Sequence, residues 1–175
     1  VVGDEPWTAV EFTSGRTYAA SPDELGERVL ATIVFSDIVD STAVLERIGD
    51  HAWTNLLHEH NVRMRAAIDR YRGREIGTTG DGFLALFDGA ARAANAALLM
   101  SASVADLGLF IRLGLHTGEV EIVGGQARGV AVHAAARVAA LAGAGEVLVS
   151  GTTHDLLEGS GLSFESRGVH ELKGL

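Results

Sequence analysis

Apolar and polar residues follow different periods along this chain, and each period predicts a different kind of element. The run Val29–Ile38 is apolar and rich in β-branched side chains, which is typical of a strand buried on both faces. Helical spacing and composition predict helices over 53–71, 89–106, 130–141 and 152–157. Short apolar segments predict strands over 110–116, 119–123 and 146–149, and an edge hairpin or strand pair over 162–172. Strands and helices therefore alternate along most of the chain.

The sequence Gly80-Asp81-Gly82 separates two apolar segments, one at Ile76 and one over 83–87, and predicts a hairpin with a tight turn. The order of elements is then β, α, α, β, β, α, β, which contains a ferredoxin-like unit. We expect an α+β fold with a ferredoxin-like βαββαβ core, in which helices cover one face of an antiparallel sheet. In such a sheet the first strand and the hairpin are neighbours at the centre.

The first 28 residues differ from the rest of the chain. They hold both prolines, Pro6 and Pro22, and show no sustained period, which predicts a linker or tail cut from a longer protein. Residues 29–175 are expected to form one domain, because their length suits a single hydrophobic core.

Composition and charge exclude several classes of function. Hydrophobic residues make up 47% of the chain and charged residues 21%, as in an ordinary globular protein. The net charge of −9 argues against a nucleic-acid surface, which needs a basic stripe to neutralise phosphates. There is no cysteine, so thiolate metal sites and cysteine nucleophiles are excluded. No apolar run could span a bilayer and no signal peptide opens the chain, so we expect a cytoplasmic protein with no membrane span in this segment.

Two aspartates, Asp37 and Asp81, stand at the ends of predicted strands. A buried aspartate is unfavourable unless charge compensates it, and a divalent cation shared by two carboxylates is a common compensation. Because the first strand and the hairpin are expected to be neighbours, both carboxylates are within reach of one pair of Mg²⁺ or Mn²⁺ ions. The alternative is that Asp37 caps the next helix, for which Ser41 or Thr42 is also a candidate cap, and that Asp81 simply fills a turn.

No other motif competes with this pair. His58 and His60 flank Glu59, but they are two residues apart on a predicted helix and point apart, and there is no His-Glu-x-x-His sequence. The chain also lacks Gly-Lys-Ser and Gly-Lys-Thr, which excludes a P-loop. We therefore expect neither a zinc enzyme nor a P-loop kinase.

Three segments carry a resemblance to a known family: Thr32–Thr42, Thr78–Leu84 and Gly129–Ala139. They resemble the catalytic domain of class III adenylyl and guanylyl cyclases, most closely the bacterial, mycobacterial-type branch. The resemblance covers the chain from about Leu30 to Leu175, with the segments in the family's order and spacing.

The resemblance implies a two-metal reaction. Asp37 and Asp81 would bind two divalent cations, Mg²⁺ or Mn²⁺, with the backbone carbonyl of Ile38 as a further ligand. The ribose 3'-hydroxyl would attack the α-phosphate of a nucleoside triphosphate, releasing pyrophosphate and a 3',5'-cyclic nucleotide. The expected product is cyclic AMP from ATP, and GTP is the alternative substrate.

The resemblance also assigns three basic side chains. Arg137 matches the arginine that stabilises charge on the transferring phosphate, and His133, one helical turn before it, matches the position of a ribose contact. Lys173 is the only lysine in the chain and matches a lysine directed at the terminal phosphates. The alternative for each is an exposed side chain without a ligand.

The positions that select the base depart from the family pattern. Adenylyl cyclases of this family have a lysine immediately before the Thr-x-Gly-Asp turn and an aspartate before the Gly-x-x-Val helix. Here those places hold Gly77 and Gln126, the second of which can both donate to and accept from a purine.

The family builds its active sites between subunits, and a single chain type carrying both Asp37 and Arg137 implies a homodimer with two symmetric sites. A fused regulatory domain outside this segment is also expected. Two hypotheses follow. The first is an active cyclase, and the second is a catalytically degenerate cyclase-like domain that binds nucleotide or dimerises to regulate a partner.

Overall fold

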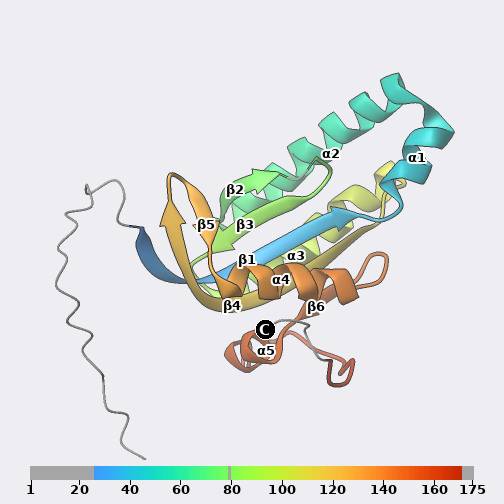
Figure 1. Cartoon of the computed structure of the whole chain (residues 1–175). Coiled ribbons are helices and arrows are strands. Elements are labelled where there is room, and N and C mark those ends of the chain that lie inside the picture. The colour runs from blue at the N-terminus through green and yellow to red at the C-terminus, as the bar shows by residue number, and fades with distance from the viewer. Residues whose placement is uncertain (1–25, 79, 171–175) are drawn as a thin grey trace, which may run out of the picture.

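The computed structural model describes residues 26–78 and 80–170, which form one mixed sheet with helices on both faces (Figure 1). The strands are β1 (Glu27–Ile38), β2 (Arg74–Thr78), β3 (Phe83–Phe87), β4 (Ile111–Val123), β5 (Gln126–Arg128) and β6 (Val147–Val149). Their order is β2-β3-β1-β4-β5, with β6 beside β4. All neighbours are antiparallel except β4 and β6. This confirms the α+β class, and the order β2-β3-β1-β4 is that of the ferredoxin-like core.

The central pair of strands is longer than the sequence predicted. β1 pairs with β4 from Glu27↔Ile122 to Ile38↔Ile111 without a break. The prediction of two strands, over 110–116 and 119–123, was wrong, because Thr117 and Gly118 stay in the ladder rather than turning. Glycine at position 118 is explained by packing rather than by a turn, because a Cβ there would lie 2.8 Å from the Cβ of Ala131 in the helix above.

The helices are α1 (Ser41–Ile48), α2 (Asp50–Arg70), α3 (Ala90–Val104), the 3₁₀ turn η1 (Ala105–Leu107), α4 (Val130–Leu141) and α5 (Gly151–Leu156). The predicted helix over 130–141 has the observed bounds. Neither Ser41 nor Thr42 caps α1. Its N-cap is Asp40, in the left-handed conformation with φ of 53°, and no side chain bonds to the helix end. None of the helices in the described ranges is long and apolar enough to cross a membrane.

Helices cover both faces of the sheet, so the expectation of a single covered face was wrong. Side chains of β1 alternate between two cores: Val34 packs with α2 and α3, whereas Ile33 packs with α4 on the other side. α4 can approach closely because β4 has a glycine beneath it. A Cβ at Gly114 would lie 2.0 Å from the backbone nitrogen of Ala139. We call the face of the sheet against which α4 packs the α4 face. The helix leaves part of this face uncovered, over β1, β2 and β3.

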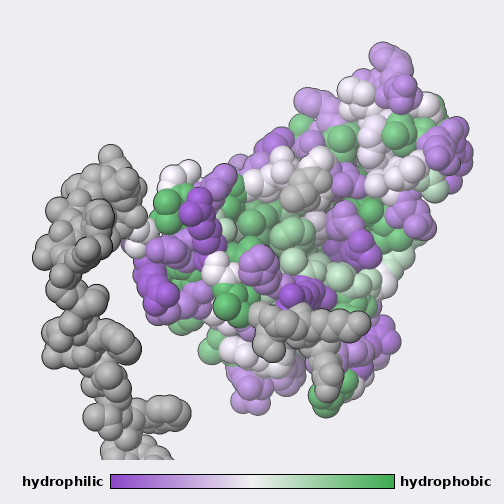
Figure 2. All heavy atoms as spheres, viewed as in Figure 1, coloured by the Kyte–Doolittle hydropathy of each residue, from purple (hydrophilic) through white to green (hydrophobic). Residues whose placement is uncertain are grey.

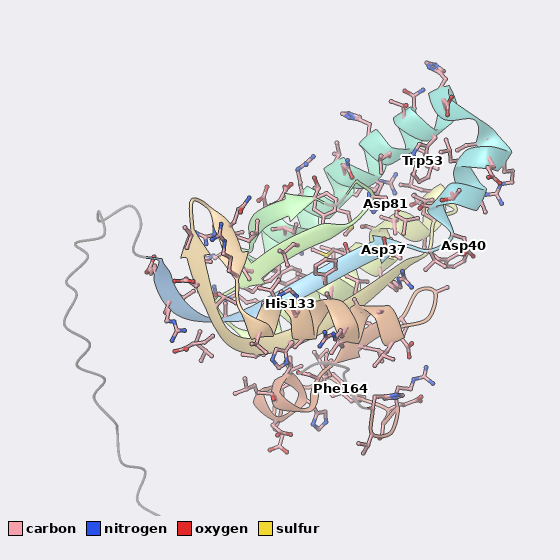
Figure 3. The ribbon with its side chains drawn as sticks, viewed as in Figure 1. Asp37, Asp40, Trp53, Asp81, His133 and Phe164 are labelled. Atoms are coloured by element: carbon pink, nitrogen blue, oxygen red, sulfur yellow. The ribbon has the colours of Figure 1, made fainter. Side chains whose placement is uncertain are left out.

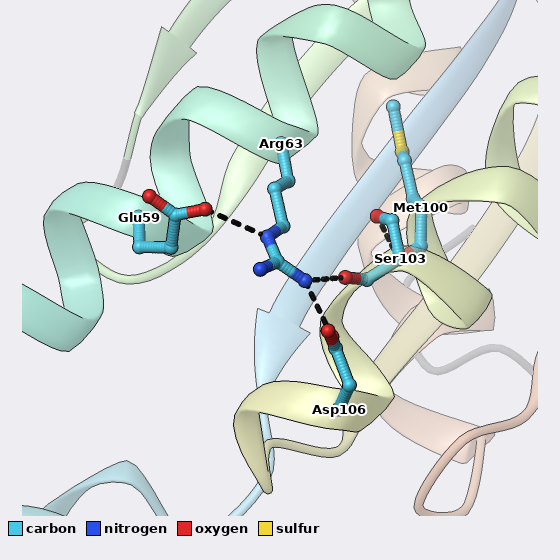
Figure 4. A network of polar contacts seen from close by, with 5 residues as sticks. All are labelled: Glu59, Arg63, Met100, Ser103 and Asp106. Atoms are coloured by element: carbon cyan, nitrogen blue, oxygen red, sulfur yellow. Dashed lines mark hydrogen bonds and ion pairs between the residues drawn. The ribbon is translucent and has the colours of Figure 1, made fainter.

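A polar cluster fastens α2 to the end of α3 (Figure 4). Arg63 on α2 donates to Glu59 at 2.9 Å, to the carbonyl of Ser103 at 2.6 Å, and to Asp106 in η1. This arrangement fixes one guanidinium among three acceptors from separate turns. It holds in place the long helix that leads into the β2–β3 hairpin.

The segment after α5 differs from the expected edge hairpin. Residues 162–170 contain no strand, and the end of the predicted hairpin, 171–172, lies outside the described residues. A cavity of about 520 Å³ lies between this segment, β6 and the second half of α4. It includes neither Asp37 nor Asp81 among its lining residues, so it is separate from the carboxylates.

Candidate functional site

The fold brings Asp37 and Asp81 to the same end of neighbouring strands (Figure 3). Ser36 of β1 pairs with Phe83 of β3, and the N–H of Phe83 donates to Ser36 Oγ at 3.1 Å. Asp37 follows Ser36, and Asp81 lies two residues before Phe83 in the turn. Since paired strands are about 4.8 Å apart, the two carboxylates belong to one site. Both side chains are partly exposed rather than buried.

Backbone contacts fix the chain where it leaves β1. Ile38 has a side chain that is 3% exposed and packs in the α2–α3 core, which orients the peptide next to Asp37. The N–H of Val39 donates to the carbonyl of Phe110 at 2.9 Å. Asp40 then takes up the left-handed conformation that turns the chain into α1. The Ile38 carbonyl is thus held at the rim of the site by its neighbours.

Arg112 is a site residue that the sequence did not reveal. Asp37 and Arg112 are cross-strand partners in the β1–β4 ladder, and Arg112 donates to Asp37 Oδ2 from Nε at 3.0 Å and from Nη2 at 2.5 Å. A guanidinium therefore balances the charge of the Asp37 carboxylate. Only the register of the ladder could have indicated this contact, and the predicted break at 117–118 obscured that register.

The residues present fit divalent cations that arrive with a nucleotide. Within the described ranges, no group of three or more His, Asp or Glu side chains could hold a metal ion. Two carboxylates and a backbone carbonyl are hard oxygen ligands of the kind that Mg²⁺ prefers, and Mg²⁺ commonly completes its shell with substrate phosphates and water. Asp37 already pairs with a cationic side chain, that of Arg112, which is consistent with a carboxylate that binds metal ions.

Arg137 and His133 lie on α4, apart from the aspartates. None of the hydrogen bonds or ion pairs among the described residues joins either side chain to Asp37 or Asp81. His133 is exposed on the helix surface, and Figure 3 shows it near the start of α4. Arg137 is partly buried, and its Nη1 is buried with no hydrogen-bond partner within 26–78 and 80–170. Within one copy of the chain, Arg137 therefore makes no hydrogen bond or ion pair with Asp37 or Asp81 among the described residues.

The two positions predicted to select the base, Gly77 and Gln126, lie on strands that approach each other. Gly77 belongs to β2, beside a register shift, and a Cβ there would meet nothing within 4 Å. Gln126 begins β5, pairs with Val123 and is exposed. β5 also approaches β2, which closes this side of the sheet. The remaining predicted substrate residue, Lys173, lies outside the described residues.

The open part of the α4 face is apolar. Phe35, Ile76 and Leu84, from three adjacent strands, are partly buried and pack against the core beneath α4. Figure 2 shows apolar surface over the middle of this face, bordered by polar side chains. Apolar contacts of this kind suit a purine ring or the surface of another subunit.

Two histidines have altered basicity. Burial lowers the pKa of His60 on α2, while its hydrogen bond to Asn61 and the negative charge of Asp81 act in the opposite direction. Burial also lowers the pKa of His116 on β4, whose Nδ1 lies 2.9 Å from Ser150 Oγ. The ring of His60 also packs against Phe83, with the centroids 5.9 Å apart, so a buried titratable side chain lies beneath the strand that follows Asp81.

Comparison with known proteins agrees with the geometry. A family model described as "Adenylate and Guanylate cyclase catalytic domain" matches residues 27–175. A candidate adenylate cyclase of Rhizobium meliloti is 28% identical over 157 residues, which cover 85% of this chain and 27% of the relative. The uncharacterized protein Rv0891c of Mycobacterium tuberculosis is 33% identical over 151 residues, covering 82% of this chain and 52% of the relative. The chain thus spans about half or less of these relatives.

A solved structure supports the same assignment. The adenylyl cyclase CyaB from P. aeruginosa matches with a TM-score of 0.77 and 25% identity, covering 85% of this chain and 90% of that one. The match of the family model over nearly the whole described region carries the assignment, and the expected resemblance is confirmed. This chain belongs to the family of adenylate and guanylate cyclase catalytic domains.

Proposed function

We propose that this domain converts ATP to 3',5'-cyclic AMP and pyrophosphate by two-metal catalysis at a homodimer interface. The observation that carries the proposal is the placement of Asp37 and Asp81 at one end of the β1–β3 pair, with Arg112 on Asp37. The family assignment supports cyclase chemistry for the domain. Mg²⁺ and Mn²⁺ are the proposed ions.

The proposed roles follow from the chemistry of the side chains. Asp37, Asp81 and the Ile38 carbonyl would hold two divalent cations, which supply positive charge to the 3'-hydroxyl and to the phosphates. The ribose 3'-oxygen bonds to the α-phosphorus, the bond from that phosphorus to the bridging oxygen of pyrophosphate breaks, and the hydroxyl proton passes to solvent. Arg112, released from Asp37, can donate to the triphosphate beside it.

A second copy of the chain is needed to complete the site. Arg137 does not reach the aspartates of its own chain, and its Nη1 is buried without a partner in the described ranges. We infer that Arg137 of the partner subunit stabilises charge on the transferring phosphate and that His133 of the partner subunit contacts the ribose. The apolar open face around Phe35 and Leu84 gives the two copies a surface to share. Lys173 is assigned to the terminal phosphates.

Recognition of the base is proposed to be weak. Gly77 offers no side chain, and the space around it is open. Gln126 is left as the polar group that would meet the purine, and an amide can pair with adenine or with guanine. These contacts do not distinguish adenine from guanine, and we propose ATP as the substrate with GTP as the alternative.

A second candidate function is a regulatory module that has lost catalysis. The empty space at Gly77 favours it, because a domain that only dimerises or binds nucleotide needs no base selector. The relatives are longer than this segment, which supports an adjoining regulatory domain in either case.

To test the proposed cyclase activity, the purified protein is incubated with ATP or GTP and Mn²⁺, and the cyclic nucleotide formed is measured. Asp81→Ala should reduce product at least about 100-fold, because it removes a proposed metal ligand. Asp69→Ala, at an exposed position near the end of α2, is the matched control and should leave the rate unchanged. Absence of product from the parent, or an Asp81→Ala variant as fast as the parent, would exclude the catalytic function.

A further inference from the structure

A buried histidine that the proposed chemistry does not use lies beneath the hairpin of Asp81. His60 on α2 is 0% exposed, and its ring centroid is 5.9 Å from that of Phe83, with the planes tilted by 56°. Phe83 is the first residue of β3 and follows Asp81 by two positions. His60 therefore packs against the strand that leaves the Asp81 turn.

The two ring nitrogens of His60 are not equivalent. Nδ1 lies 3.0 Å from Oδ1 of Asn61, and because this oxygen can only accept, Nδ1 carries the proton and donates. Burial lowers the pKa of His60, so the ring is neutral near pH 7 and Nε2 keeps a lone pair. Within residues 26–78 and 80–170, Nε2 is buried and has no hydrogen-bond partner.

The surroundings make this unpaired nitrogen notable. A buried polar group without a partner destabilises a fold, and an apolar side chain at position 60 would avoid that. The residues around it are well fixed, since Phe83 is held by Ser36 on one strand and its ring lies 5.4 Å from the guanidinium carbon of Arg65. Phe83 follows Asp81 by two residues, so the ring contact places His60 next to the turn that carries Asp81. These contacts point to a hydrogen-bond partner for Nε2 in the adjacent Gly80–Gly82 turn.

We propose that His60 is a positioning residue for Asp81: its Nε2 accepts a hydrogen bond from a backbone N–H of the Gly80–Gly82 turn when Asp81 binds a divalent cation together with Asp37. The inference rests on the proposed function, because it concerns the support of the same metal site. Outer-shell hydrogen bonds of this kind orient metal ligands and contribute to metal affinity. The buried Nε2, which has no hydrogen-bond partner among the described residues, is then the acceptor that the metal-bound turn uses.

Two substitutions distinguish the roles of the two ring nitrogens of His60. His60→Gln places an amide oxygen, an acceptor, near the position of Nε2, whereas His60→Asn keeps a polar group only near the position of Nδ1. The readout is Mn²⁺ binding to the whole chain, measured by electron paramagnetic resonance with a non-cyclisable ATP analogue present. We expect Mn²⁺ affinity to fall about tenfold in His60→Asn and by less than about threefold in His60→Gln.

Thermal unfolding in EDTA measures the stability of each variant without metal and identifies losses that come from the fold alone. Asn61→Leu is a second variant in which His60 is kept. It removes the acceptor that holds the proton on Nδ1, so the proton can move to Nε2, and Mn²⁺ affinity should fall about threefold or more.

Three outcomes would overturn the inference. They are parent-like Mn²⁺ affinity in both His60→Asn and Asn61→Leu, an equal loss in His60→Gln and His60→Asn, or losses that only follow the stability in EDTA. If the parent binds Mn²⁺ no better than Asp81→Ala does, the metal site itself is refuted, and the proposed function fails with the inference. Asp81-dependent binding in the parent with no effect at position 60 refutes the inference alone.

Discussion

Arg112 and Asp37 form an ion pair across the two central strands, in which Nη2 at 2.5 Å and Nε at 3.0 Å both donate to the same carboxylate oxygen, Oδ2. The pair lies at the end of β1, where the chain turns toward α1. An arginine that pairs with a carboxylate is also placed to donate to a phosphate when that carboxylate binds a cation. The contact thus links the free and the substrate-bound forms of the proposed site.

Replacing this arginine tests its role. Arg112→Leu should lower kcat/KM for ATP at least about tenfold, because a donor to the triphosphate is lost. The free energy of unfolding should change by less than about 1 kcal/mol, since the two side chains are 37% and 32% exposed. Steady-state kinetics and urea unfolding measure the two effects. Arg92→Leu, which removes an exposed ion pair with Asp88, is the control and should keep the parent rate. An Arg112→Leu variant with unchanged kinetics would refute the assignment.

The open space at Gly77 leads to a prediction about the base. Gly77→Lys should fold normally, because a Cβ there meets nothing within 4 Å. The adenylyl cyclases that this chain resembles have lysine at this place, so the ratio of kcat/KM for ATP to that for GTP should rise about tenfold. Gly77→Ala is the matched control and should leave the ratio unchanged. An equal ratio in the lysine variant would show that the base does not lie beside β2.

A chain of buried hydroxyls joins β1, β4 and α5. Thr117 Oγ1 lies 2.9 Å from Thr32 Oγ1 and 3.1 Å from Thr153 Oγ1. Thr117→Val keeps the shape but leaves buried hydroxyls without this partner, so the free energy of unfolding should fall by about 1–3 kcal/mol. Thr152→Val, at an exposed position of α5, should change it by less than about 0.5 kcal/mol. Urea unfolding measures both, and equal stabilities would contradict the structural role of the chain.

Stability should depend on pH through one buried and one partly buried histidine. The pKa values of His60 and His116 are lowered from the ordinary value of 6.5, because burial disfavours the charged ring. The unfolded chain therefore binds more protons just below pH 6.5 than the folded chain does, and the free energy of unfolding should fall as the pH is lowered through this range. His116→Asn should reduce the slope between about pH 7.5 and 5.5. A slope unchanged by this substitution would argue against a neutral, partly buried His116.

The elements that could be predicted from the sequence are those whose signal is local. The spacing of alanines and valines over 130–141 predicted α4 with its observed bounds, and Gly80-Asp81-Gly82 predicted the turn between β2 and β3. Because strand order follows from this connectivity, the neighbouring positions of Asp37 and Asp81 could also be expected. Cyclase membership was likewise evident from the motifs.

The features that could not be predicted depend on contacts between distant segments. Gly118 resembles a turn residue, yet it is small because Ala131 of α4 packs over it. The pairing of Arg112 with Asp37 depends on the register of an unbroken β4, and the burial of His60 depends on how α2 sits beneath Phe83. Packing and register of this kind are set by the whole fold rather than by local pattern.

The most direct measurement mixes two inactive variants. Asp81→Ala lacks a proposed metal ligand and Arg137→Ala lacks the arginine that would come from the other subunit, so each alone should make almost no cyclic AMP. Mixed in equal amounts and allowed to exchange subunits, they should regain about a quarter of the parent activity, since half of the dimers then hold one intact site. A mixture no more active than its two components, or an Arg137→Ala variant as active as the parent, would contradict a site shared between two copies of this chain.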